Sequence, residues 1–243
     1  GTIPDVAAFW FSPRGMALFS NSLLLALAVA AVATVIGLLV ALRLLDARTR
    51  FLAATVLVAL FVPPHVHALA WTIAIGRANL LLDAASLPVF PITGFWPSFW
   101  IQFMTVLPRA TVLAACGLGA AAPRLIEAGL VAAPANRVFN RVLLPLSAPL
   151  TLAIAAAIFA LSLLDAGIPL VFQYGVYATA VTTQYAASGD AARTAILALP
   201  LVGTALGAIG FAAAVGRGAA ANAAGTFAGM SMRLPLPGNW RLP

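Results

Sequence analysis

Long apolar stretches separated by short polar segments are the feature that most limits what this chain can fold into. A helix needs about 20 apolar residues to cross a bilayer, and helices pair their backbone N–H and C=O groups internally, as hydrocarbon requires. Five stretches are long enough, and we therefore expect an all-α integral membrane protein with about five transmembrane helices. The stretches cover residues of about 17–43, 51–75, 97–119, 147–169 and 191–215.

The composition excludes an ordinary soluble domain. The chain is 63% hydrophobic and 8% charged, whereas about 25% of the residues in a soluble domain are charged. Its formal net charge of +7 comes with 13 Arg and no Lys. A basic soluble protein could bind nucleic acid, but these Arg residues lie beside apolar stretches, where they set membrane orientation. We expect contact with a lipid bilayer and no nucleic acid.

The distribution of Arg predicts which side of the membrane each loop faces. Cytoplasmic loops carry an excess of basic residues. The loops after the first, third and fifth stretches are rich in Arg, whereas the opposite loops hold only Arg14, Arg77 and Arg193. We therefore expect the N-terminus outside and the C-terminus in the cytoplasm. The basic set is Arg43, Arg48, Arg50, Arg124, Arg137, Arg141, Arg217, Arg233 and Arg241.

The remaining segments define the predicted organisation. Residues 1–16 read as an external lead-in, because their prolines oppose a long helix. Residues 17–216 form the transmembrane domain. Residues 217–243 are rich in Gly and Ala and then in Pro, a composition typical of a flexible linker. We expect a tail there, or a joint that leads to a second membrane-spanning half.

Two prolines interrupt the second stretch. Pro63-Pro64 predicts that its helix bends or breaks there. His65 and His67 follow directly and raise the question of metal or proton handling. Two residues that are two positions apart on a helix do not face one site, so this pattern does not favour a metal site.

Arg109 is the charged residue nearest the middle of a predicted span. A charge at that depth costs about 3 kcal/mol on insertion scales, so we expect Arg109 to face protein or water. Two interpretations stay open, a residue of a transport pathway and a member of a structural pair. Asp165 is a partner by sign, although the expected depths of the two residues differ by about 12 Å at about 1.5 Å per residue.

A polar insert at residues 120–146 separates the third and fourth stretches. Ala128 and Ala132 are four residues apart, so they share one face of a short helix, which Pro134 ends or redirects. Small side chains on such a face allow close approach by another protein. The helix is too short to be stable alone, which suggests docking on a partner. On these residues alone, an ordinary charged loop is the alternative.

Glu127-Ala128 opens this insert and Val142-Leu143-Leu144-Pro145 closes it. The pattern resembles the cytoplasmic EAA loop of ABC-importer permeases, although Gly129 stands where that family has a second Ala. The order of apolar stretches and Pro breaks from about Asn21 to Leu201 is also similar to that family. The resemblance implies a coupling helix that docks on an ATPase subunit. Its coupling residues are Glu127, Ala128, Gly129, Ala132, Ala133 and Arg137.

The resemblance implies a permease subunit of an ATP-driven importer in the bacterial inner membrane. The implied partners are ABC ATPase subunits, an external substrate-binding protein and a second permease unit, either another copy or a fused second half. A chain without Lys has no P-loop, so we do not expect it to hydrolyse ATP. We also expect no other catalysis, and no cofactor or metal site in it. ATP and Mg are expected in the partner ATPase.

The substrate is less defined. Residues 164–200 look most like permeases of the ferric-iron, thiamine, polyamine and phosphonate branch, and we take ferric iron as the first candidate. The main alternative function is an ion-coupled secondary carrier, which places ionisable side chains beside broken helices at the membrane midplane. A membrane-embedded enzyme comes third. The six acidic residues and two His of this chain are scattered along the sequence and form no catalytic cluster.

Overall fold

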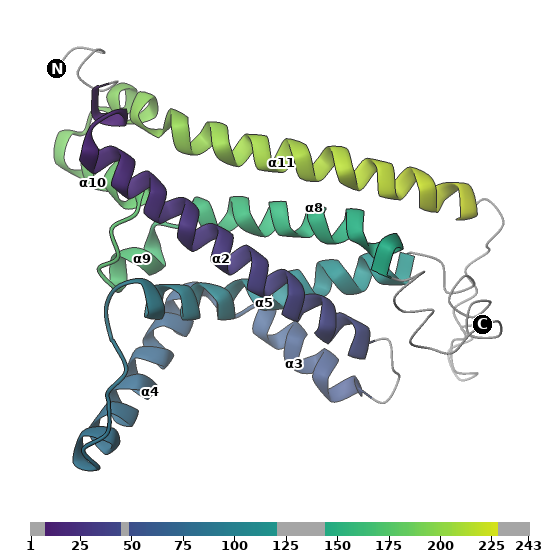
Figure 1. Ribbon diagram of the computed structural model, residues 1–243, viewed down its shortest axis with the longest axis horizontal. Helices are drawn as coiled ribbons and strands as arrows, with labels where there is room; N and C mark the ends of the chain where they lie inside the picture. The colour runs from purple at the N-terminus through teal and green to yellow at the C-terminus, as the bar shows by residue number, and fades with distance from the viewer. Residues whose placement is uncertain (1–7, 45–48, 121–143, 228–243) are drawn as a thin grey trace, which may run out of the picture.

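The computed structural model describes residues 8–44, 49–120 and 144–227, and within these ranges the ordered elements are helices, without a strand (Figure 1). This confirms the all-α class. The helices are α2 (Pro13–Leu44), α3 (Arg50–Leu60), α4 (Pro64–Ala84), α5 (Phe95–Ala120), α8 (Leu144–Leu163), α9 (Gly167–Val171), α10 (Tyr177–Ser188) and α11 (Ala191–Phe227).

Three helices are long and apolar enough to cross a membrane, namely α2, residues Phe95–Leu118 of α5 and residues Ala191–Arg217 of α11. The α3–α4 pair makes a fourth span if its two bent parts are counted together. In α8 the apolar part, Ser147–Leu163, is shorter. The chain is thus a multi-pass membrane protein, with three or four candidate spans in its described residues where five were expected.

The break between α3 and α4 is one reason for the lower number. The two helices meet at an angle of 108°, which confirms the break predicted at Pro63-Pro64. Pro63 has an extended backbone, with φ −64° and ψ 147°, as expected for a residue that precedes another proline. As a result, α4 diverges from the other helices (Figure 1).

The early end of α8 is the second reason. The fourth stretch was expected to continue to residue 169, but the helix ends at Leu163. Asp165 Oδ1 accepts hydrogen bonds from the backbone N–H groups of Gly167 at 2.8 Å and Ile168 at 3.3 Å. Such a local side-chain bond offers the backbone a turn in place of the helix. The short helix α9 then follows.

Three other helix ends differ clearly from the expected ranges. Helix α4 continues to Ala84, whereas the second stretch was expected to end at about residue 75. Helix α2 begins at Pro13, inside the expected lead-in, because Ser12 Oγ accepts the Gly15 N–H at 3.0 Å and proline suits the first helical position. Helix α11 continues to Phe227, into the expected tail. Its last part is rich in alanine, the strongest helix former.

The core lies where four long helices meet. Helix α2 packs against α5 and α8, and α11 packs along α8 (Figure 1). The buried members of this core include Leu25, Val29, Ile158 and Leu201. The shorter helix α10 packs against both α2 and α11, and α4 reaches the bundle through α5 and α9.

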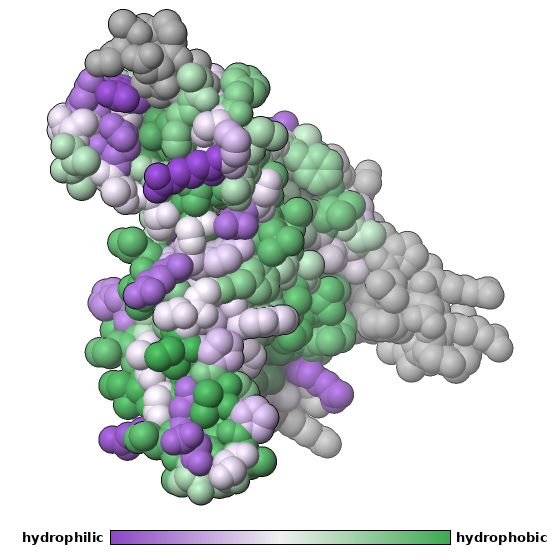
Figure 2. All heavy atoms as spheres, turned by 60° about the vertical axis from the view of Figure 1, so that its left-hand side comes forward, coloured by the Kyte–Doolittle hydropathy of each residue, from purple (hydrophilic) through white to green (hydrophobic). Residues whose placement is uncertain are grey.

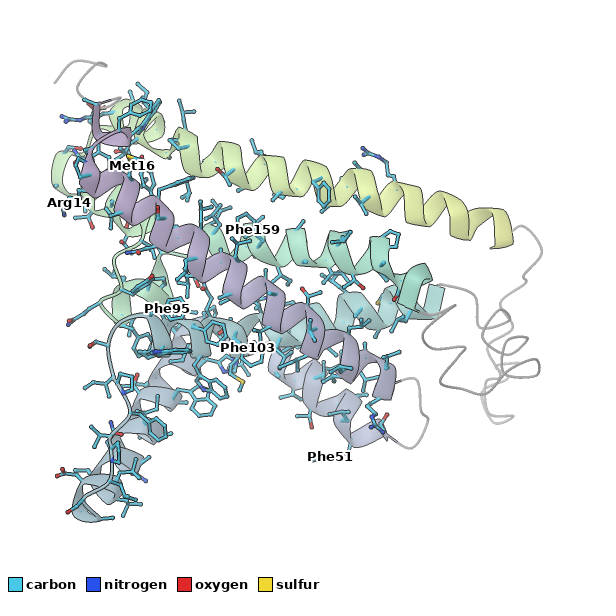
Figure 3. The ribbon with its side chains drawn as sticks, viewed as in Figure 1. Arg14, Met16, Phe51, Phe95, Phe103 and Phe159 are labelled. Carbon is cyan, nitrogen blue, oxygen red and sulfur yellow. The ribbon has the colours of Figure 1, made fainter. Side chains whose placement is uncertain are left out.

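Aromatic rings form a row along α5. Phe99 stacks between Phe95 and Phe103, with ring centroids 6.0 Å and 6.1 Å apart. The outer two rings lie two turns apart on the helix (Figure 3). Tyr174, just before α10, meets Phe95 edge to face at 5.7 Å. Each such pair contributes about 0.5–1.5 kcal/mol beyond the burial of its area, so the row ties α5 to the segment that precedes α10.

Gly37 is the point of closest approach between α2 and α5. A Cβ atom on Gly37 would lie 2.9 Å from Ala110 Cβ and 3.0 Å from the backbone N of Thr111. The small residues at this crossing therefore bring two backbones together, as is common in membrane bundles. In contrast, a Cβ at Gly203 or Gly207 of α11 would meet nothing within 4 Å in this chain.

Tyr177 links three helices at one end of the bundle. Its backbone N–H donates to Ser22 Oγ of α2 at 2.7 Å, and its hydroxyl donates to the Leu197 carbonyl of α11 at 3.0 Å. The residue is 1% exposed, and burial raises the pKa of Tyr177 from 10.0 to about 12. The Tyr177 hydroxyl therefore keeps its proton to a higher pH in the folded protein than in the unfolded chain.

Gly37→Val is expected to separate α2 from α5, because the added side chain meets backbone atoms that cannot move aside. Overpacking of this kind costs about 1–3 kcal/mol. The measurement is the midpoint of thermal unfolding of the purified protein in detergent. Gly203→Val is the matched control, since the same change there meets open space. Equal midpoints for the two variants would contradict the close crossing.

Tyr177→Phe is expected to lower the stability at neutral pH by about 0.5–1.5 kcal/mol, the net value of one hydrogen bond. Because the pKa of Tyr177 is higher in the folded state, its contribution is complete below pH 10 and is lost as the pH rises towards 12. The difference in unfolding midpoint between wild type and variant should therefore shrink over this range. A constant difference across it would show that the hydroxyl is not buried.

Candidate functional site

A row of polar side chains follows one face of α5. Ser98, Gln102, Thr105 and Arg109 are spaced by three or four residues, so they lie above one another on the helix. The first three are 0%, 1% and 6% exposed, and Arg109 is half-buried. We call these four residues the α5 polar row. Polar groups inside an apolar bundle are costly and tend to mark functional positions, so this row is the candidate site.

Arg109 occupies the end of the row nearest the polar insert. One guanidinium nitrogen, Nη1, donates to the Thr105 carbonyl at 3.2 Å. Arg109 faces protein in part, and within the described part of the chain no carboxylate forms an ion pair with it. Asp165, its partner by sign, instead contacts Gln102. Gln102 and Arg109 are seven residues apart on α5, which is about 10 Å along a helix.

Gln102 joins the middle of α5 to the end of α8. Its Nε2 donates to the Ser162 carbonyl at 2.9 Å and to Asp165 Oδ2 at 3.3 Å. Gln102 Oε1 and the Ser162 hydroxyl are buried and have no hydrogen-bond partner among the described residues. An unpaired buried polar group costs about 1–3 kcal/mol. This cluster therefore offers the Gln102 amide oxygen and the Ser162 hydroxyl group as hydrogen-bond partners to a polar group that enters the bundle.

The two histidines of α4 do not form a site together. His65 is exposed, whereas His67 is half-buried and its Nε2 has no hydrogen-bond partner in the described part of the chain. His67 is on α4, which packs against α5, the helix of Arg109. No group of three or more potential metal-ligating side chains occurs among the described residues. The structure thus brings one histidine near Arg109 and leaves the other apart.

The predicted coupling residues cannot be compared with the structure. They all fall within residues 121–143, outside the described ranges, so their roles stay predictions. These residues are Glu127, Ala128, Gly129, Ala132, Ala133 and Arg137.

Sequence reasoning identified only one member of the α5 polar row. Arg109 was recognised by its charge, but Gln102 and Thr105 were not considered, although their spacing relative to it is visible in the sequence. The contact between Gln102 and Ser162 joins residues 60 positions apart, and no periodicity in the sequence indicates it.

Comparison with protein-family models finds none that matches the chain, and comparison with curated proteins finds no match. The site must therefore be interpreted from its own residues.

Gln102→Met is expected to destabilise the bundle, because it keeps the side-chain size but removes both hydrogen bonds to the end of α8. The loss should be about 1–3 kcal/mol, the cost of leaving buried polar groups unpaired, and thermal unfolding in detergent measures it. Thr55→Val is a suitable control, since Thr55 Oγ1 bonds only to the Phe51 carbonyl of its own helix at 3.0 Å. If both changes had the same small effect, Gln102 would not connect α5 to α8.

Proposed function

We propose that this chain is the transmembrane permease subunit of an ATP-driven ABC importer. The observation that carries the proposal is the position of the polar insert with the EAA-like pattern. Helix α5 ends at Ala120 and α8 begins at Leu144, and both ends lie at the same end of the bundle (Figure 1). The insert thus joins two packed helices of an apolar bundle, where a moving partner could act on both.

The sidedness of the Arg residues supports the proposed orientation. Arg43 lies in the last turn of α2, and Arg217 lies late in α11. These turns are at the end of the bundle that carries the insert (Figure 1). Arg14 lies at the opposite end (Figure 3). By the positive-inside rule the insert faces the cytoplasm, where an ATPase is found.

Exposed apolar faces support contacts with lipid and with a second permease unit. Phe51 of α3 is 86% exposed, Leu81 of α4 is 75% exposed and Leu206 of α11 is 62% exposed. Large apolar faces of this kind are covered by hydrocarbon or by another protein. We propose a second permease unit, as another copy or as a fused second half, together with ATPase subunits and an external substrate-binding protein.

Alternating access is the proposed mechanism. ATP and Mg bind to the ATPase, its subunits close, and the coupling segment around Glu127 to Ala133 moves with them. A switch between 1:99 and 99:1 populations needs about 5.5 kcal/mol of differential contact energy, and docking of two coupling segments is a reasonable source. The chain then forms the translocation pathway and catalyses no reaction itself. Arg109, the half-buried member of the α5 polar row, is the proposed pathway residue.

An ion-coupled secondary carrier is the second candidate. The break between α3 and α4, with His67 beside Arg109, is the observation that favours it, because carriers place ionisable groups beside discontinuous helices. The two proposals differ in their energy source. Uptake by the isolated chain in vesicles with an ion gradient and no ATPase would favour the carrier.

Ala132→Trp tests the coupling segment of the importer proposal. If Ala132 packs against an ATPase subunit, a bulky side chain there should prevent close approach, so ATPase copurification and transport should both fall at least tenfold, a loss of about 1.4 kcal/mol or more in contact energy. The insert lies outside the apolar stretches, so membrane insertion should stay near normal.

The comparison must be made at matched membrane expression, with Ala219→Trp near the end of α11 as a bulky control outside the insert. Normal transport and normal copurification in Ala132→Trp would show that this face touches no partner, and the importer proposal would lose its main support.

A further inference from the structure

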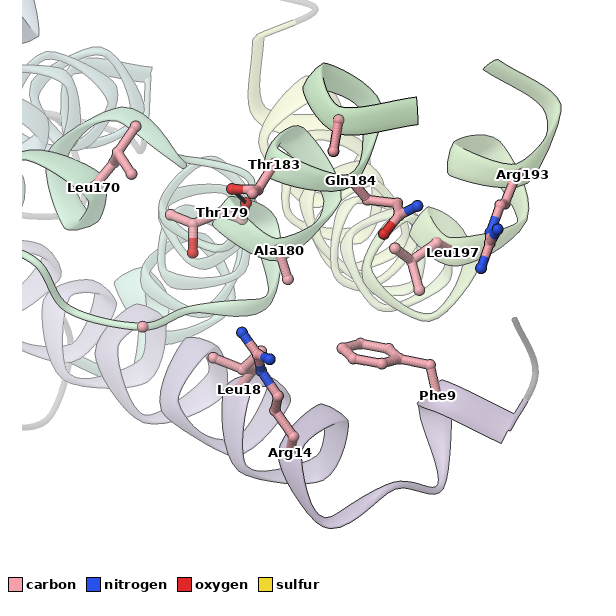
Figure 4. A pocket seen from close by; sticks show the side chains of 12 residues that line it. Phe9, Arg14, Leu18, Leu170, Thr179, Ala180, Thr183, Gln184, Arg193 and Leu197 are labelled. Atoms are coloured by element: carbon pink, nitrogen blue, oxygen red, sulfur yellow. Dashed lines mark hydrogen bonds between the residues drawn. The ribbon is translucent and has the colours of Figure 1, made fainter. Parts of the chain in front are cut away.

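A cavity of about 430 Å³ opens at the end of the bundle opposite the polar insert. It lies between the first turns of α2, helix α10 and the first turns of α11 (Figure 4). Figure 2 turns this end of the bundle toward the viewer and shows hydrophilic side chains over the upper part of the molecule. The volume is within the range of small-molecule sites, about 300–1,000 Å³. Under the proposed orientation, this cavity faces the outside.

Among the residues that the structure describes, two arginines and no acidic side chain line the cavity. Arg14 comes from α2 and Arg193 from α11, and they lie on different sides of the space (Figure 4). Asp190, three residues before Arg193, does not line the cavity, and its Oδ1 accepts the backbone N–H of Arg193 at 3.0 Å at the start of α11. Within the described residues neither guanidinium has a hydrogen-bond or ion-pair partner. The described lining therefore contributes two positive charges and no negative one.

Among the described residues, the other polar side chains of the cavity add one donor group that forms no hydrogen bond, the amide of Gln184. Thr179 Oγ1 donates to the Val176 carbonyl at 2.6 Å, and Thr183 Oγ1 donates to the Thr179 carbonyl at 2.7 Å. These hydroxyl protons are thus already used. The side-chain amide of Gln184 faces the space between the two arginines (Figure 4). The donors left for a ligand are those of Arg14, Arg193 and Gln184.

The apolar part of the lining limits the size and type of the ligand. Phe9, Leu18 and Leu197 contribute apolar side chains to the lining, which suit the carbon skeleton of a ligand that also carries an anionic group. Guanidinium groups bind carboxylate and phosphate oxygens through paired N–H donors. A bare metal cation would be repelled by both arginines.

We propose that this cavity binds a small organic oxyanion, with its carboxylate or phosphate group held between Arg14 and Arg193. Such a group is found on free solutes and on the headgroups of anionic lipids, and both share this chemistry. If the ligand is a free solute, the cavity is an outward-facing subsite for an anionic substrate of the permease. The assignment of the ligand as a substrate rests on the proposed function, whereas the proposal that an oxyanion binds in the cavity does not.

Direct binding to the purified chain in nanodiscs of neutral lipid tests the proposal without any ATPase. Titration calorimetry with citrate and with glycerol 3-phosphate, at constant ionic strength, should show saturable binding. Arg14→Gln and Arg193→Gln should each weaken it roughly ten- to a hundredfold, as expected for loss of a charged hydrogen bond. Arg77→Gln is the matched control, because Arg77 is exposed on α4, away from the cavity. Helical circular dichroism of each variant confirms that it is folded, and Arg14→Lys should restore part of the affinity.

The outcomes separate the two sources and the two proposals. Binding of free anions that depends on both arginines supports the cavity site with a solute ligand. Arginine-dependent retention of phosphatidylglycerol, with no response to free anions, supports the same site with a lipid headgroup. Absence of both, or binding that Arg77→Gln weakens as much as Arg14→Gln, overturns the site. Because ATPase copurification is measured separately, failure of the anion site leaves the importer proposal standing, and failure of copurification leaves the anion site standing.

Discussion

Polar groups in an apolar bundle must find partners within the protein, and this constraint shapes the structure more than any single contact. Backbone groups meet it by forming helices. Where a helix stops, side chains take over, as Asp165 does for the first N–H groups of α9 and Ser22 does for the N–H of Tyr177. Gln102 satisfies part of its own requirement on Ser162 and Asp165. Polar side chains thus meet this requirement both at helix ends and between α5 and the end of α8.

This distribution gives the two ends of the bundle different properties. One end carries the polar insert and the last turns of α2 and α11, and the other carries the cavity between α2, α10 and α11. The α5 polar row lies between them, from Ser98 to Arg109. An importer needs a site for its substrate outside, a polar route through the bundle and a lever in the cytoplasm. In the importer proposed above, the cavity, Arg109 and the insert would take these three roles in turn.

The sequence predicted the class of fold and the break at Pro63-Pro64, because both follow from local chemistry, namely long apolar stretches and a residue without an N–H. It did not predict the early end of α8, which depends on a turn formed by Asp165, or the continuation of α11 through an alanine-rich segment. It singled out Arg109 in the candidate site but not Gln102, whose partner lies 60 residues away. The cavity at Arg14 and Arg193 also required the structure, since these residues are far apart in the chain.

Orientation is the central claim on which the proposed function depends, and thiol labelling of residue 137 tests it most directly. The exposed Cys116 is first replaced by Ala, and single cysteines are placed at Arg137 and at Asp83. In spheroplasts an impermeant thiol reagent should label position 83 and leave position 137 unlabelled until the membrane is permeabilised. Labelling of position 137 in sealed spheroplasts would contradict both the orientation and the assignment of the insert to the cytoplasm.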